Sequence, residues 1–236
     1  MIFDNKFYPI DTTIGFVKGD VVNVSNFIID WYKRIGNPLD IIKRRVYNND
    51  AEGAMAGLLP LTSGRIRRTL ILSNSSDWVM YLNNLVNGTD ISALTYIAEK
   101  LKTSCIDAAT TLSSDDLGYK INSPHAGATF FDYDEFAVDG RKIRERWIHA
   151  INEDGNWKFE TEGDLFSFEN PEQFKARKIK DRFNRHHLIA YLEHFGIKLN
   201  DPNFFSNSKA VLIERIGVPY PNERAFSLEE ARHRFD

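Results

Sequence analysis

The densest group of acidic side chains in the sequence lies in the stretch DYDEF, residues 132–136. Asp132 and Asp134 are two residues apart, so both side chains would lie on one face of a strand. A carboxylate pair of this kind can bind a hard cation, or it can raise the pKa of one carboxyl group for acid–base chemistry. A run of charges is more often a solvated strand end, and that interpretation stays beside the chemical one.

The chain has six histidines, and none of them forms the HExxH pattern of a zinc enzyme. His187 and His194 lie on one expected helix, about 10 Å apart along its axis, which is too far for two ligands of one metal ion. His187 alone is a candidate base. The sequence predicts no metal site and no cofactor.

The serine-rich stretch SNSSD, residues 73–77, has no nucleophile signature around it, because the chain contains no GxSxG elbow. Phosphate-binding loops of the GxxxxGK[ST] or GxGxxG type are also absent from the sequence. Ser, Asn and Asp stabilise turns through hydrogen bonds to nearby backbone. SNSSD is therefore predicted to be a hairpin loop between two strands.

One stretch is strongly basic. Residues 175–187, KARKIKDRFNRHH, could meet phosphates of a nucleic acid or an acidic protein. They could equally pair with the acidic hairpin that precedes them, and adjacent segments of opposite sign favour that internal pairing. The net charge of the chain is −3, which makes a nucleic acid the less favoured partner.

The elements that would position these groups are mostly strands and hairpins. Trp78 to Leu82 is apolar on both sides, which predicts a central strand covered on both faces. RERWIHAINEDGNWKFETEG predicts a hairpin that turns at Asp154 and Gly155. Helices are expected over residues 24–35, over 91–101 with Asp90 as the cap, and over 185–195 with Asn184 as the cap.

This order of elements predicts an α+β fold with a mainly antiparallel sheet built from hairpins and with flanking helices. A loop near residues 163–172 divides the chain into a sheet-rich body, residues 1–163, and a helical C-terminal part, residues 164–236, packed on the same domain. The 236 residues are 42% hydrophobic and 27% charged, which is typical of a globular protein.

The compartment is predicted from absences in the sequence. The chain has one cysteine, Cys105, which excludes an internal disulfide and favours a reducing compartment. The N-terminal residues MIFDNKFYPIDTT lack a basic start and an apolar run, and no stretch is long and apolar enough for a membrane helix. We therefore expect a cytoplasmic protein.

Two regions carry the recognisable elements of the chain. Residues 69–101 contain a Trp-bearing hairpin and the NGTD turn. Residues 146–195 contain the RWIHAINEDGNWKFE hairpin and the DRFNRHHLIAYLEHFGI helix. In this organisation it resembles bacterial polymorphic-toxin immunity proteins. The resemblance implies a non-catalytic binding protein that neutralises a cognate toxin by occluding its active site. Exposed aromatics and arginines would then carry the binding energy. The candidate partner-binding residues are Trp78, Tyr81, Arg144, Arg146, Trp147 and Trp157.

Two alternatives remain open at this stage. The first is an enzyme whose site is assembled from scattered residues, with Asp132, Asp134, His149, His187 and Arg144 as the first to test. The second is a nucleic-acid-associated regulator that uses residues 175–187. No motif in the sequence separates these two hypotheses from the binding protein.

Overall fold

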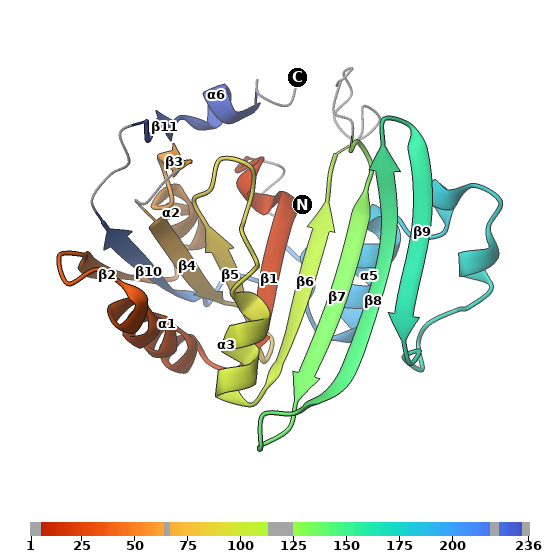
Figure 1. The fold of residues 1–236 in the computed structure, drawn as a ribbon, viewed down its shortest axis with the longest axis horizontal. Coiled ribbons are helices and arrows are strands. Elements are labelled where there is room, and N and C mark those ends of the chain that lie inside the picture. The colour runs from red at the N-terminus through yellow and green to blue at the C-terminus, as the bar shows by residue number, and fades with distance from the viewer. Residues whose placement is uncertain (1–5, 64–66, 113–124, 218–221, 233–236) are drawn as a thin grey trace.

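A nine-stranded antiparallel sheet organises the chain in the computed structural model, which describes residues 6–63, 67–112, 125–217 and 222–232 (Figure 1). The spatial order of its strands is β2-β10-β4-β5-β1-β6-β7-β8-β9. A small second sheet pairs β3 with β11. The α+β class and the mainly antiparallel sheet predicted from the sequence are confirmed.

The strands of the large sheet are β1 (Thr13–Lys18), β2 (Ile41–Asn48), β4 (Arg67–Ser73), β5 (Trp78–Asn83), β6 (Ser104–Thr110), β7 (Thr129–Phe136), β8 (Lys142–Glu153), β9 (Asn156–Gly163) and β10 (Lys209–Ile216). Those of the small sheet are β3 (Leu61–Thr62) and β11 (Ala225–Phe226). The helices are α1 (Val21–Ile35), α2 (Ala51–Ala56), α3 (Leu94–Leu101), α5 (Arg185–His194) and α6 (Leu228–Arg232). None of the helices in the described residues is long and apolar enough to cross a membrane.

The serine-rich stretch, residues 73–77, contains the loop of the β4–β5 hairpin. The side chain of Asn74 accepts hydrogen bonds from the Ser76 backbone N–H at 2.8 Å and from the Ser76 hydroxyl at 2.6 Å. The backbone N–H of Trp78 donates to that same hydroxyl oxygen at 3.2 Å. Local polar contacts therefore hold residues 73–77 as a turn, as predicted, and every residue of the following strand β5 is buried.

The β8–β9 hairpin is also confirmed. Asp154 and Gly155 form its turn with φ angles of 52° and 85°. Positive φ at both central positions is what a tight hairpin turn with the right-handed twist of its strands requires, and Asp-Gly adopts it at low cost. From Arg146 to Asn152 the long strand β8 alternates buried and partly exposed side chains, because one of its faces is packed and the other is less covered.

One predicted helix start is wrong. Asp90 was expected to cap a helix from Ile91, but α3 begins at Leu94 and the residue before it, Ala93, makes no side-chain cap. The Asp90 carboxylate instead accepts from the Ser92 backbone N–H at 3.0 Å, which forms a turn ahead of the helix. The cap predicted for α5 is present, since the Asn184 side chain accepts from the backbone N–H groups of His186 and His187 in the first turn of the helix.

Residues 164–236 are joined to the body through the sheet itself. They contain α5 and α6, but they also supply β10, which lies between β2 and β4 and pairs with both along its length. The sequence segments 1–163 and 164–236 therefore share one sheet.

Both faces of the sheet carry a buried apolar cluster. On one face, α1 and α3 pack against β10, β4, β5 and β1, with Val17, Val79 and Ile97 among the buried residues. On the other face, α2, α5 and the segments around them cover residues from β4 to β8, including Phe131 and Ile148. The second cluster extends further along the sheet than the first, so the two faces are not equally covered.

Gly163 offers a sharp test of this architecture, because it ends β9 with a φ of +87° and a side chain there would overlap the Glu145 carbonyl oxygen. We expect Gly163→Ala to lower the free energy of unfolding by about 3 kcal/mol or more, measured by urea denaturation. Gly155→Ala is the matched control: its φ is +85°, yet nothing lies near its added methyl group, so only about 1 kcal/mol of backbone strain is expected. Equal losses in the two variants would contradict the close packing at Gly163.

Candidate functional site: the uncovered face of β6–β9

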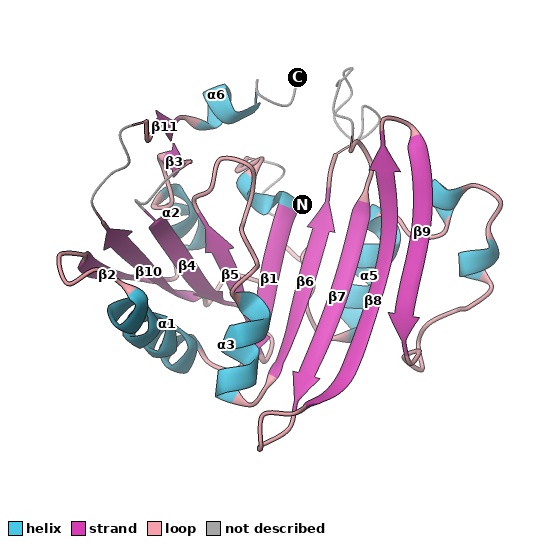
Figure 2. Cartoon of the chain, in the orientation of Figure 1, coloured by secondary structure: helices cyan, strands magenta, loops and turns pink. Residues whose placement is uncertain are grey.

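The α1 and α3 side of the sheet is covered only over part of its width. In the described part of the chain, α3 lies over β1, β6 and the Asp134 end of β7, and no helix follows it across the rest of β7 or across β8 and β9 on this side (Figure 2). Helix α5 lies behind these strands, on the opposite face. The four strands β6–β9 therefore present one face outward, which we call the open face.

The pairing register fixes which side chains share the open face. One row across β6–β9 contains Asp107, Asp132, Trp147 and Glu162, which are opposite one another on neighbouring strands. The next row contains Ala109, Phe130, His149 and Glu160. Side chains directly opposite on adjacent strands touch, so aromatic and acidic groups are brought together here from separate parts of the sequence.

Aromatic rings form the centre of the open face. The His149 ring lies edge-on to Phe130 with centroids 5.0 Å apart, and tilted against Trp147 at 4.8 Å. Its Nε2 is 2.6 Å from the Asp132 carboxylate, a distance at which the imidazole N–H donates to the carboxylate oxygen. All three rings are half-buried by one another and stay accessible. Since each ring is braced by its neighbours, the aromatic surface is ordered before any partner arrives.

Asp107 is the unusual acid of this surface. Burial, and next the nearby carboxylate of Asp132, raise the pKa of the Asp107 carboxyl group to about 8. Its Oδ1 atom is buried and has no hydrogen-bond partner among the described residues. Asp107 is therefore mostly protonated at pH 7, and a cation placed beside it would favour loss of its proton.

Only one of the six residues predicted to bind a partner lies on the open face, and it is Trp147. Trp78 is 4% exposed and packs edge-on against Phe195. Tyr81 is 3% exposed and lies under α3 beside Leu94. The prediction of exposed contact residues is wrong for Trp78 and Tyr81, because β5 is central and each of its faces is covered.

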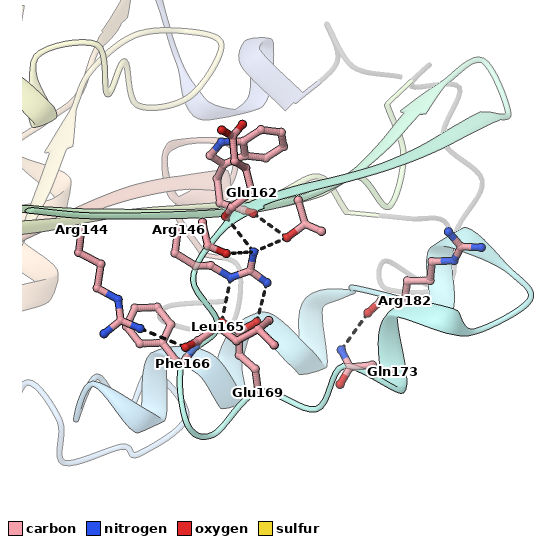
Figure 3. Close-up of polar contacts among 11 residues, drawn as sticks. Arg144, Arg146, Glu162, Leu165, Phe166, Glu169, Gln173 and Arg182 are labelled. Carbon is pink, nitrogen blue, oxygen red and sulfur yellow. Dashed lines mark hydrogen bonds and ion pairs between the residues drawn. The ribbon is translucent and has the colours of Figure 1, made fainter. Parts of the chain in front are cut away.

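Trp157 and Arg144 lie on the other side of the sheet. Trp157 packs against the core cluster that α5 covers, although it is partly exposed. The Arg144 guanidinium lies over the Phe166 ring, 3.8 Å from its centroid, and donates to the Leu165 carbonyl at 3.3 Å (Figure 3). Arg144 thus holds the segment that follows β9 against the sheet.

Arg146 is 2% exposed, so it is not the exposed arginine that was expected at this position. It forms a two-pronged ion pair with Glu169, with N–O distances of 2.9 and 2.6 Å (Figure 3). It also donates to the Thr161 hydroxyl at 2.5 Å and to the Glu162 carbonyl at 2.8 Å. The Glu169 carboxylate accepts in addition from the Phe166 backbone N–H at 3.0 Å. Because both charges are fully paired, the buried pair fixes the position of the segment after β9.

Of the five residues of the enzyme hypothesis, only Asp132 and His149 are brought into contact with each other. Asp132 and His149 meet on the open face. Asp134 is held by Lys142 at 2.9 Å and by the Thr95 hydroxyl at 3.1 Å, beside α3. His187 lies on α5 behind the sheet, 6.4 Å between ring centroids from Phe183, and burial lowers its pKa. The structure therefore supports only a pair of the scattered residues as a common site.

The basic stretch after β9 makes local contacts. Lys175 pairs with Glu172 at 2.6 Å, and the Arg182 Nε donates to the Ala176 carbonyl at 2.8 Å. In the acidic hairpin, Glu153 pairs with Lys158 at 2.9 Å. These ion pairs do not join the basic stretch to the acidic hairpin; a contact between them is the Arg182 guanidinium over the Phe159 ring, 5.6 Å from its centroid. Within the described residues, no group of three or more His, Cys, Asp or Glu side chains is placed to hold a metal ion.

Sequence reasoning missed Asp107 and Phe130 as members of a site. The signal was incomplete: CIDAATTL and ATFFDYDEF were recognised as strands, but which residues of two separate strands stand opposite depends on the register. Two of the candidate contact residues, Trp78 and Tyr81, lie on the central strand β5, whereas the centre of the accessible aromatic face lies two strands beyond β1.

Comparison with known proteins assigns no family. No family model matches the chain, and no curated protein and no solved structure matches it either. The resemblance to immunity proteins stays a prediction.

The Arg146–Glu169 pair can be tested by a double-mutant cycle. We expect Arg146→Met to lower the free energy of unfolding by about 3–5 kcal/mol, since it leaves the Glu169 carboxylate buried and unpaired. Arg146→Met with Glu169→Met should cost clearly less than the sum of the two single changes. Urea unfolding of the four proteins measures this coupling, and additive losses would contradict it.

Asp107 predicts a pH dependence of stability. Its pKa is about 8 in the folded chain and 3.8 when unfolded, so the folded state binds the extra proton between these values and stability falls as the pH rises from about 4 to 8. Asp107→Asn removes that loss. We expect the variant to unfold with the same free energy as the wild type near pH 4 and with a clearly larger free energy at pH 8, since each unit of pKa shift corresponds to about 1.4 kcal/mol. A stability difference that does not grow with pH would contradict the buried protonated carboxyl group.

Proposed function

We propose that this chain is a non-catalytic cytoplasmic binding protein that neutralises a toxin domain by covering its active site with the open face. The observation that carries the proposal is an accessible sheet face on which Trp147, Phe130 and His149 form an aromatic centre. Aromatic side chains held rigid on a sheet supply contact area at low cost in conformational entropy, and they dominate the energetics of protein interfaces.

The charges around the centre favour a basic partner. Asp132, Glu160 and Glu162 surround the rings, and Lys158 is the nearest cation on β9. Carboxylates of this kind attract a positively charged protein surface and accelerate its capture. An arginine or lysine of the partner could stack on the Trp147 ring while it pairs with Asp107 or Asp132. Binding of such a cation would release a proton from Asp107.

An acid–base enzyme is the second candidate, and the contact between Asp132 and His149 is the observation that favours it. A carboxylate that orients an imidazole is a common arrangement for general base catalysis. We rank it second because these groups lie on a broad sheet face. The hollows of about 670 and 650 Å³ are lined by other residues, near α2 and near the β4–β5 turn.

The proposal is tested by capture with matched variants. Wild-type protein, Trp147→Ala and Trp157→Ala are each tagged and used to bind the toxin domain, first from their own cells and then as purified partners. We expect Trp147→Ala to weaken binding by at least about thirtyfold, as for a central aromatic anchor.

Trp157 is the matched control, since it is a partly buried tryptophan on the neighbouring strand but on the opposite face. Trp157→Ala should bind within about threefold of the wild type. A stoichiometric partner that is lost equally from both variants would contradict the open face as the binding surface. A chain that retains no protein partner would contradict the binding function as a whole.

A further inference from the structure

The β2 edge of the sheet lies on the other side of the molecule from the open face and has an exposed backbone and, within the described residues, an unpaired cluster of charges. Among the strands that the structure describes, β2 pairs only with β10 and is the edge strand opposite β9 (Figure 1). It is exposed along almost its entire length, including the apolar side chains of Ile41 and Val46, which are 56% and 44% exposed. An edge of this length offers a row of backbone groups that can pair with another strand.

The register shows which backbone groups are free. The Asn49 N–H donates to the Ser208 carbonyl directly opposite, so the odd-numbered residues of β2 make the bonds to β10. The backbone N–H and C=O groups of the even-numbered residues, Ile42, Arg44, Val46 and Asn48, therefore point away from the sheet. They form the donor and acceptor pattern that an added antiparallel or parallel strand needs.

Three consecutive cations stand on this edge. Lys43 and Arg45 lie on the α2 face of the sheet and Arg44 on the α1 face, because side chains alternate along a strand. Among the described residues, neither Lys43 nor Arg44 has an acidic partner, and Arg45 donates only to the Tyr47 hydroxyl at 3.3 Å. The nearest acid, Glu214, is paired with Arg68 at 2.5 Å. The positive charge of the edge is therefore not neutralised by ion pairs within the described residues.

A hollow adjoins the edge. It has a volume of about 380 Å³ and is lined by Lys43, Arg44, Arg45, Arg68 and the end of α2 at Gly57, and its one acidic lining residue, Glu214, is paired with Arg68. A side chain from a strand added to β2 would extend toward this hollow on the α2 face. A carboxylate there would meet cationic walls, whereas a cation would be repelled.

We propose that the β2 edge binds an acidic extended segment of another protein, which adds a tenth strand to the sheet. Backbone hydrogen bonds to the even-numbered residues would provide affinity, and carboxylates opposite Lys43, Arg44 and Arg45 would provide specificity. The same cations prevent the β2 edges of two copies from pairing with each other, because like charges directly opposite repel. This site is independent of the open face, from which it is separated by the width of the sheet.

The probe is a labelled peptide of about nine residues, in which three central glutamates are flanked by valine and threonine, with blocked ends. Binding is measured by fluorescence anisotropy. We expect the full chain to bind it at least about tenfold more tightly than the same peptide with glutamine in place of glutamate. Binding should weaken when the salt concentration rises from about 50 to 500 mM. Lys43→Glu with Arg45→Glu should abolish the preference.

Two changes test whether a strand is added. Val46→Pro removes an N–H that points away from β10, and proline is tolerated on an edge strand at such a position. A glutamate peptide that is N-methylated at its central residues keeps its charge but cannot donate hydrogen bonds, and it leaves the protein unchanged. Each change should weaken binding by at least about tenfold.

Equal binding of the N-methylated and unmethylated peptides would overturn strand addition. So would a single-stranded oligonucleotide of the same charge that binds as tightly as the peptide, since that result indicates a general anion surface. Thermal unfolding of Val46→Pro verifies that the variant is folded, and the N-methylated peptide decides the question if it is not.

Discussion

The buried ion pair between Arg146 and Glu169 is the interaction on which the rest of the arrangement depends. Arg146 stands on the covered face of β8, and its guanidinium binds the Glu169 side chain as well as backbone and side-chain groups of β9. Two charges placed in the interior are tolerated only when their hydrogen-bonding groups are satisfied, and here both partners are. The pair therefore fixes the chain where it leaves the sheet after β9. Arg144, which lies on the Phe166 ring, strengthens the same attachment.

This attachment decides which face of β6–β9 remains accessible. The segment that begins at Leu165 leads to α5, whose buried side chains complete the cluster around Phe131 and Tyr191. With that face covered, the opposite face has only α3 at its border, and the Phe130, Trp147 and His149 rings stay partly exposed in the described part of the chain. The Arg146–Glu169 pair thus gives a structural role to a residue that looked like a contact arginine in the sequence. It leaves the contact role to the alternate positions of the same strand, Trp147 and His149.

The sequence predicted the turns and helix caps better than it predicted which strands pair and which side chains are buried. The class, the hairpins at SNSSD and at Asp154–Gly155 and the Asn184 cap follow from local patterns of turn residues and alternation, so they could be read directly. Burial could not be read in this way, because Trp78 and Trp147 stand on similar strands and differ only in what covers them. The site also depends on long-range register: Asp107 stands opposite Asp132 on β6 and β7, and no local sequence pattern specifies that pairing. Asp132 and His149 were both candidates for chemistry, but only the pairing of β7 with β8 joins them.

The central claim is that the open face is the surface by which this protein meets its partner. The most direct measurement is hydroxyl-radical footprinting of the chain, free and in complex with the captured toxin domain, with the modified side chains identified by mass. The account predicts that Trp147, Phe130 and His149 lose reactivity in the complex, while Trp157 on the opposite face and Trp31 on α1 keep theirs. Protection confined to α1 or to the opposite face, with Trp147 still reactive, would contradict it.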